Sequence, residues 1–335
     1  MRSNQSGTGR ALADSNKYGH DRTTLGIALI VLSVLAMAFA DALVKLASAD
    51  MPVWQIFVAR SVVAIAILAA IMRATKIAMR PLSLKWAYIR TGLLVLTWLA
   101  FYAALPMLQL SVAAVVVYTN PILIVLLSAL LLGEPVTSRQ WSGVIVGFAG
   151  VVTILRPGSD AFSVFMLLPL LAAAAYALAM VLTRGKCRDE EPLALGLAVH
   201  VSFLLAGSAA VALFQILDLD RSTVALYPFL LRGWTTLDLT QWGLVAVLGI
   251  LSAAYFVGVA KAYQVAPPPI IATFDYGYLV GAVLWGFVLF AETPDPATVA
   301  GMVLITAAGL LVAGSASDKH SASQQESPAP GRQQS

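Results

Sequence analysis

Long apolar runs separated by short polar segments make up most of this chain. Each run has roughly the 20 mostly apolar residues that an α-helix needs to cross a bilayer. Ten such runs lie at 24–46, 53–72, 86–106, 110–132, 140–156, 162–183, 192–217, 240–263, 267–290 and 297–315. The segments between them are too short to hold a folded aqueous domain. The pattern therefore predicts an all-α integral membrane protein with ten transmembrane helices.

The composition agrees with a lipid environment. The chain is 59% hydrophobic and 11% charged, with a mean hydropathy of +0.84, whereas an ordinary soluble domain is about 45–50% apolar and about 25% charged. One soluble core could not bury so much apolar surface. The single cysteine, Cys187, excludes an intrachain disulfide and a cysteine-cluster metal site. We expect no metal and no cofactor.

The positive charges are distributed unevenly between the predicted loops. If the N-terminus is cytoplasmic, fifteen of the 21 lysine and arginine residues lie in cytoplasmic segments and three lie on the opposite side. This is a strong positive-inside bias, which predicts cytoplasmic termini and an even number of spans. The basic pI of about 9.2 therefore reflects membrane topology, and we expect no nucleic-acid partner.

Both ends of the chain are polar and rich in Ser, Gln, Gly and Pro. Residues 1–23 and 316–335 are therefore predicted to be disordered cytoplasmic tails. A secretory signal with a cleavage site at Ala38-Phe39-Ala40 is the alternative at the N-terminus. The apolar run begins near Leu25 and continues past that site, which favours a transmembrane helix.

Two segments of the chain, one beginning at Leu131 and the other at Val288, resemble one another and indicate an internal repeat. Glu134 and Gly143 correspond to Glu292 and Gly301 at the same separation. The repeat predicts two five-helix units, 24–156 and 162–315. Because five is odd, the second unit enters the membrane from the opposite face, giving the inverted repeats that are typical of secondary transporters.

Three segments carry a resemblance to a known family. They are DALVKLASADMPVWQIFVAR (41–60), YTNPILIVLLSALLLGEPVTSRQWSGVIVGFAGVVTILRPG (118–158) and IATFDYGYLVGAVLWGFVLFAE (271–292). The chain resembles the drug/metabolite transporter superfamily, specifically its EamA-type ten-helix carriers, over roughly 24–315. The resemblance implies an inner-membrane carrier whose central cavity is lined largely by helices 1, 3, 4, 6, 8 and 9. Family members often carry a proline where this chain has Thr273.

A narrower resemblance concerns the substrate. Asp41 and Lys45, followed by Pro52, Gln55 and Arg60, resemble a branch that includes carriers of S-adenosylmethionine and of riboflavin. Other branches of the superfamily export amino acids. The resemblance therefore leaves both the substrate and the direction of transport open.

Asp41 and Lys45 are the first candidate site residues, because residues four apart share one face of a helix. A charge at mid-membrane is costly, which favours a wet cavity; the alternative is that Lys45 snorkels to the outer headgroups. The matching segment 171–185 has no such pair. Arg60 could pair with Asp41 or bind a carboxylate or phosphate. Arg90 is explained by snorkelling at the inner face.

Three further polar positions lie within the apolar runs. Asp275 is a candidate proton carrier, or it accepts hydrogen bonds from Tyr276 or Tyr255. His200 is expected to be a packing residue. Asn120-Pro121 either breaks its helix and frees a carbonyl for substrate, or forms a harmless kink.

The small and acidic residues near these positions are expected to be structural. Gly143, Gly147 and Gly150 are expected to allow close helix packing. Glu134 and Glu292 are expected only to cap helix ends or to pair with loops.

Aromatic residues complete the predicted substrate-binding set, since they offer stacking faces and hydroxyl donors. Each is otherwise explained as an interfacial anchor. They are Trp98, Tyr102, Tyr118, Tyr176, Tyr255, Tyr276 and Tyr278.

These observations favour a secondary carrier of a small organic metabolite. The aromatic set, together with the narrower resemblance, favours uptake of an aromatic or heterocyclic compound such as riboflavin or S-adenosylmethionine, with amino-acid export as the alternative. The chain has no GxxxxGK[ST], HExxH or GxSxG pattern, so neither direct ATP drive nor an intramembrane enzyme is expected. A structural or receptor-like membrane protein is equally disfavoured. The expected partners are the substrate and the bilayer, and a homodimer is left open.

Overall fold

The computed structural model describes residues 6–132, 138–155, 163–217, 220–266, 271, 274–275, 277–304, 306–308 and 311. Its helices in chain order are α1 (Ser6–Ala47), α2 (Val53–Ala74), α3 (Leu84–Ala104), α4 (Leu110–Val117), α5 (Asn120–Leu132), α6 (Ser138–Leu155), η1 (Val164–Met166), α7 (Leu167–Lys186), α8 (Pro192–Ile216), α9 (Arg221–Leu226), α10 (Pro228–Leu231), α11 (Leu239–Val265) and α13 (Gly277–Phe290). Residues 296–304 and 306–308 are also helical.

The described part of the chain is all-helical and has several segments fit to span a membrane. Seven helices within it are long and apolar enough to cross a bilayer, judged by length and composition. Three further apolar helices, Trp141–Gly150, Gly277–Phe290 and Pro296–Ala308, are shorter. The protein is therefore a multi-pass helical membrane protein. The division into ten spans and two inverted repeats stays a prediction.

The first helix begins earlier than the apolar pattern indicates. α1 starts at Ser6 and so includes residues 6–23, for which the composition predicts disorder. Adding residues to an existing helix costs far less than starting a new one, so the apolar segment that begins near Thr24 can extend the helix backwards. The C-terminal segment 316–335 lies outside the described residues.

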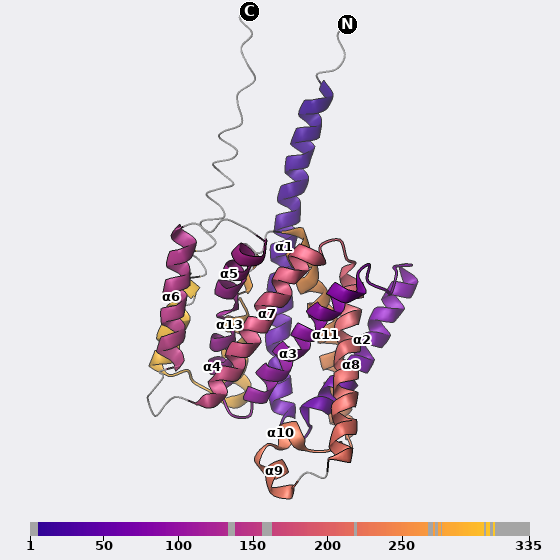
Figure 1. Ribbon diagram of the computed structural model, residues 1–335, viewed down its shortest axis with the longest axis vertical. Helices are drawn as coiled ribbons and strands as arrows, with labels where there is room; N and C mark the ends of the chain where they lie inside the picture. The colour runs from indigo at the N-terminus through magenta and orange to yellow at the C-terminus, as the bar shows by residue number, and fades with distance from the viewer. Residues whose placement is uncertain are drawn as a thin grey trace, which may run out of the picture.

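The main helix contacts join the two halves of the chain. α1 packs against α11 and α13, α3 packs against α7, and α2 packs against α8. In Figure 1, α1 and α3 accordingly lie in the middle of the bundle, while α6 lies at one edge, where its contacts are with α4 and α5. The interior between the halves is thus the place where residues distant in sequence meet.

The outer surface of the bundle is apolar. Large exposed side chains on different helices include Leu130, Ile145, Phe148, Leu205 and Ile216. Apolar patches of this extent are unusual on a soluble monomer. They are expected where lipid chains cover the surface.

The predicted break in the fourth apolar run is present. α4 ends at Val117, Tyr118 and Thr119 form a turn, and α5 begins at Asn120. Pro121 lies in the first turn of α5, where a missing N–H costs no intrahelical hydrogen bond. The break directs Tyr118 and Asn120 into the bundle, where both side chains are buried.

Glycines permit the closest helix approaches. A Cβ at Gly147 would overlap Ile122 on α5, which confirms a packing role for this position of α6. At Gly249 of α11, a Cβ would lie 2.6 Å from the Val63 Cβ and 2.9 Å from the Arg60 carbonyl oxygen on α2. The backbone of α2 cannot yield without moving Arg60.

We predict that Gly249→Ala lowers the stability of the protein by about 1–3 kcal/mol, because the added methyl overpacks the α2–α11 contact. Gly243→Ala is the matched control on the same helix, since nothing lies within 4 Å of its Cβ position, and it should be neutral or slightly stabilising. Thermal unfolding of the purified variants in detergent measures the difference. Equal melting temperatures for the two variants would contradict the close contact.

Candidate functional site

Asp41 of α1 is the centre of a buried hydrogen-bond network. Its Oδ1 accepts a hydrogen bond from the Tyr102 hydroxyl at 2.9 Å, and its Oδ2 accepts one from the Tyr278 hydroxyl at 2.8 Å. A carboxylate away from water requires such donors. Asp41 thereby joins α1 to α3 and α13, which lie far apart in the sequence.

Arg60 of α2 joins this network through Tyr102. Its Nη1 donates to the Tyr102 hydroxyl at 2.9 Å, and the same hydroxyl donates to Asp41. The predicted pairing of Arg60 with Asp41 is therefore bridged by a tyrosine. The guanidinium carbon lies 4.7–5.4 Å from the ring centres of Phe57, Tyr102 and Phe203, close enough for cation–π attraction.

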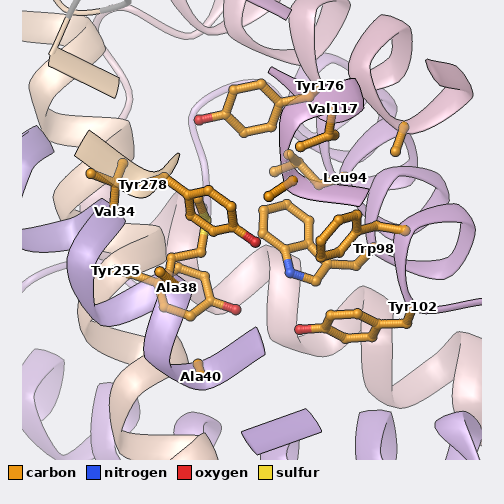
Figure 2. Packing of buried hydrophobic residues seen from close by; sticks show 14 of the residues in the cluster. Val34, Ala38, Ala40, Leu94, Trp98, Tyr102, Val117, Tyr176, Tyr255 and Tyr278 are labelled. Carbon is orange, nitrogen blue, oxygen red and sulfur yellow. The ribbon is translucent and has the colours of Figure 1, made fainter. Parts of the chain in front are cut away.

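Four aromatic side chains surround the carboxylate in space. Figure 2 shows the hydroxyls of Tyr102, Tyr255 and Tyr278 converging on one region beside the indole nitrogen of Trp98, whereas the Tyr176 hydroxyl points away from it. The Trp98 and Tyr255 rings are stacked at 6.1 Å between centroids. Of these groups, Tyr102 and Tyr278 donate to Asp41, whereas the Tyr255 hydroxyl and the Trp98 Nε1 have no hydrogen-bond partner among the described residues.

A small cavity lined by buried side chains lies next to Asp41. Its volume is about 30 Å³, enough for a water molecule or two and far below the roughly 300–1,000 Å³ of typical ligand pockets. The cavity is therefore too small to hold a metabolite. The cavity is lined by Met37, Asp41, Thr97, Trp98, Phe101, Val117, Tyr118, Asn120, Tyr176 and Tyr278.

Six of the sequence-predicted residues thus share one cavity. Three of its polar atoms, the Trp98 Nε1, the Tyr176 hydroxyl and the Asn120 Oδ1, are buried without a hydrogen-bond partner among the described residues. Unsatisfied buried polar atoms are costly, so these three atoms are ready to bind water or a polar solute. Tyr118 and Tyr278 stack at 4.9 Å and supply an aromatic wall.

Asp275 is also buried, but its partners differ from those expected. The Tyr118 hydroxyl lies 3.5 Å from its Oδ1 and the Tyr263 hydroxyl 3.3 Å from its Oδ2. Tyr255 instead stacks on Trp98, so the prediction of a Tyr255 partner is wrong. Tyr276 lies outside the described residues. Asp275 is thus separated from the cavity by Tyr118.

Lys45 does not pair with Asp41, which corrects the expectation from their helical spacing. Its Nζ lies 2.6 Å from the Glu292 Oε1 and donates to the Leu108 carbonyl at 2.8 Å. The Glu292 Oε2 accepts from the Leu110 amide at 2.8 Å. Lys45 lies one turn nearer the end of α1 than Asp41, where the acid that follows α13 is within reach.

Several other expectations need correction or stay open. Arg90 does not snorkel: its side chain is only 1% exposed, and its Nε donates to the Thr183 Oγ1 at 2.6 Å. His200 is buried and packs edge-on against Phe256 at 5.4 Å, as a packing residue should. Glu134 lies outside the described residues.

Three contacts were not predicted. Glu292 accepts from the first amide of α4, as a capping residue should, and it also forms an ion pair with Lys45 of α1. Tyr263 approaches Asp275, and Thr183 binds Arg90. Periodicity could have placed Tyr263 and Thr183 on helices, but not opposite these partners.

Charged and aromatic side chains gathered around an interior cavity of a multi-pass helical protein are typical of a substrate or ion pathway across the membrane. Residues 24–156 match the sequence model of the EamA-like transporter family, which confirms the resemblance found in the sequence. This part of the chain is therefore similar to EamA-like membrane transporters, and the relatives described next also carry transporter names.

Three relatives carry different transport names. The chain is 28% identical to the pseudopaline exporter CntI of Pseudomonas aeruginosa over 84% of its own length and 94% of that protein. It is 30% identical to a riboflavin transporter of Brucella anthropi, over 57% of this chain and 63% of that protein. It is 25% identical to an S-adenosylmethionine uptake transporter of Rickettsia prowazekii, over 60% and 62% of the two chains.

A solved crystal structure has the same fold. It superposes with a TM-score of 0.60, covering 88% of this chain and 97% of that chain, at 21% sequence identity. The likeness concerns the fold alone.

We predict that Lys45 and Glu292 are energetically coupled. Lys45→Met and Glu292→Gln should each lower stability by roughly 1–3 kcal/mol, because each leaves a partly buried charge unpaired. The double variant should lose less than the sum of the two. A double-mutant cycle of melting temperatures measures the coupling, and strictly additive losses would contradict it.

Proposed function

We propose that the protein is a secondary transporter that moves a small organic metabolite by alternating access between two inverted five-helix repeats, 24–156 and 162–315. The observation that carries this proposal is the small interior cavity at Asp41, which is bounded by helices from both halves. A carrier needs such a site at the interface of its repeats. The broken helix at Tyr118–Asn120 supports the same mechanism.

The small volume of the cavity sets what must happen during transport. A metabolite cannot fit in about 30 Å³, so α1, α3 and α13 must separate for it to enter. The hydrogen bonds from Tyr102 and Tyr278 to Asp41 close the site from two helices at once. A polar group of the substrate that replaces one of these hydroxyls at Asp41 would open the network without leaving the carboxylate unpaired.

The proposed substrate is an aromatic or heterocyclic compound. The rings of Trp98, Tyr118, Tyr176 and Tyr278 line the cavity and offer faces for stacking. Asp41, Arg60, Asn120 and Asp275 supply polar contacts in or behind it. Tyr102 and Tyr255 border the same region. The relatives named for riboflavin and S-adenosylmethionine support uptake of such a compound.

Export is the second candidate direction. It is favoured by the relative named as a pseudopaline exporter, which the chain matches over 94% of its length. Export of amino acids or related metabolites is the corresponding alternative substrate class. We further propose an inner-membrane location with both termini cytoplasmic, on the basis of the positive-inside bias, which places Lys45 and Glu292 at the outer end of the cavity.

We predict that Asp41→Asn impairs transport by at least about tenfold while membrane abundance is preserved. The amide keeps the volume but loses the charge that orders Tyr102, Tyr278 and Arg60, and charge-assisted hydrogen bonds are the stronger ones. Asp50→Asn is the matched control, since Asp50 is exposed after the end of α1. Initial transport rates and immunoblots of membranes are compared. Unchanged kinetics would make Asp41 a structural residue.

Direction and substrate are tested in proteoliposomes. Riboflavin and S-adenosylmethionine are supplied outside or loaded inside, and their saturable movement is followed in each orientation with and without a proton gradient. We expect saturable uptake of at least one of the two. Saturable amino-acid movement without either compound would favour the alternative, and no saturable movement of any solute would contradict a carrier.

A further inference from the structure

Arg90 of α3 is a buried cation without a countercharge. Its side chain is 1% exposed, and no carboxylate oxygen among the described residues lies within 4 Å of it. Its Nε donates to the Thr183 hydroxyl on α7, while its Nη1 has no hydrogen-bond partner in the described part of the chain. An uncompensated charge of this kind costs several kcal/mol.

Arg60 has a different environment, although it is equally buried. It is connected to Asp41 through the Tyr102 hydroxyl and lies against three aromatic rings. This bridge to a carboxylate offsets its positive charge, although its Nε and Nη2 have no hydrogen-bond partner among the described residues. Arg90 differs because no hydrogen bond in the described part of the chain links it to a carboxylate.

Arg90 lies on the helix face that leads to the cavity. Trp98 follows it by eight residues on α3, and Tyr176 precedes Thr183 by seven residues on α7, so each pair is about two turns apart on one face. Trp98 and Tyr176 contact one another at 6.3 Å between ring centroids, and both line the cavity. The Arg90–Thr183 pair therefore continues the same α3–α7 seam about 12 Å from the cavity.

Tyr176 belongs to both positions. It lines the cavity, and it precedes Thr183 on α7 by about two turns. Its hydroxyl has no hydrogen-bond partner among the described residues. A solute leaving the cavity along the seam would meet the Tyr176 hydroxyl and then the free N–H groups of Arg90.

A purely structural role does not account for this arrangement. The hydrogen bond to Thr183 fixes α3 against α7, but a neutral donor such as glutamine would form it without burying a charge. A guanidinium presents several N–H groups in a planar fork that fits carboxylates and phosphates. The unused donor is thus suited to an oxyanion that is present only part of the time.

We propose that Arg90 and Thr183 form a second substrate station, between the cavity and the end of the bundle at which α3 begins, and that the transported metabolite carries an oxyanion, either a carboxylate or a phosphate. This inference rests on the proposed transport function and narrows its substrate class. The aromatic cavity binds the ring of the substrate, and Arg90 binds its anionic group when the helices move apart.

Two matched compound pairs test the proposal by equilibrium dialysis with the purified full-length protein in detergent. Riboflavin 5′-phosphate is compared with riboflavin, and indole-3-acetate with indole-3-acetamide, so that each pair differs in the oxyanion. We expect the wild type to bind the anionic member of at least one pair at least about tenfold more tightly. The pair that responds distinguishes phosphate from carboxylate.

Substitutions locate the preference. Arg90→Gln should reduce the tenfold ratio to near one and leave the Kd of the neutral member unchanged. Arg90→Lys should retain part of the ratio, because it keeps the charge but loses the fork. Arg73→Gln is the control, since Arg73 is exposed in the last turn of α2, and should keep the full ratio. If Arg90→Gln does not yield folded protein, the binding ratio is compared between the wild type, Arg90→Lys and Thr183→Val instead. Both of these variants keep the positive charge.

The outcomes separate the two levels of the proposal. Equal binding of both members of each pair by the wild type, or an anion preference that survives in Arg90→Gln, overturns the oxyanion station and leaves the transport function standing. Binding of none of the four compounds counts against both the aromatic substrate class and the station. Loss of the preference for the anionic compound in Arg90→Gln, but not in the Arg73→Gln control, supports the station.

Discussion

The arrangement of the interior depends on how the Asp41 carboxylate is kept in an apolar environment. A single buried carboxylate is tolerable only if donors and a countercharge reach it. Tyr102 and Tyr278 donate to it from α3 and α13, and Arg60 of α2 is linked to it through the Tyr102 hydroxyl. The requirement of one side chain on α1 therefore fixes three other helices around it, and the position of the cavity follows from where those helices meet.

The same interaction gives the protein a means of changing shape. Neutral hydroxyls hold Asp41, so a polar solute can exchange with them at small net cost, since a typical hydrogen bond contributes only about 0.5–1.5 kcal/mol net. The Lys45–Glu292 pair closes the end of α1 against α13 more firmly, through an ion pair and two backbone contacts. A closed state held by one strong contact at the end and several exchangeable ones at the centre is suited to opening in response to substrate.

Much of the fold and part of the site follow from the sequence for identifiable reasons. Each apolar run overlaps a helix, because length and hydropathy act locally. Asp41, Trp98, Tyr118, Asn120, Tyr176 and Tyr278 meet at the cavity, as polar and aromatic residues within apolar helices must gather away from lipid. The ten-span count and the two repeats are predictions that the seven long helices do not decide.

What the sequence could not supply is the choice of partner. Helical spacing placed Lys45 beside Asp41, yet its partner Glu292 lies 247 positions away. Proximity to a helix end suggested that Arg90 snorkels, yet contact with α7 buries it. Both errors have the same cause: periodicity states which face a residue occupies, while tertiary packing decides what that face meets.

The buried charges are distributed asymmetrically in the interior, and a repeat of two equivalent halves would not by itself produce this asymmetry. If the two halves were equivalent, their buried charges would be equivalent as well. Instead Asp41 and Arg60 are joined through Tyr102, whereas Arg90 has no such link to a carboxylate among the described residues. An anionic solute would be drawn from the cavity towards Arg90, where its charge supplies what the protein lacks. A carrier must release its substrate as readily as it accepts it. Two binding positions, one at the cavity and one at Arg90, meet this requirement if neither of them holds the substrate permanently.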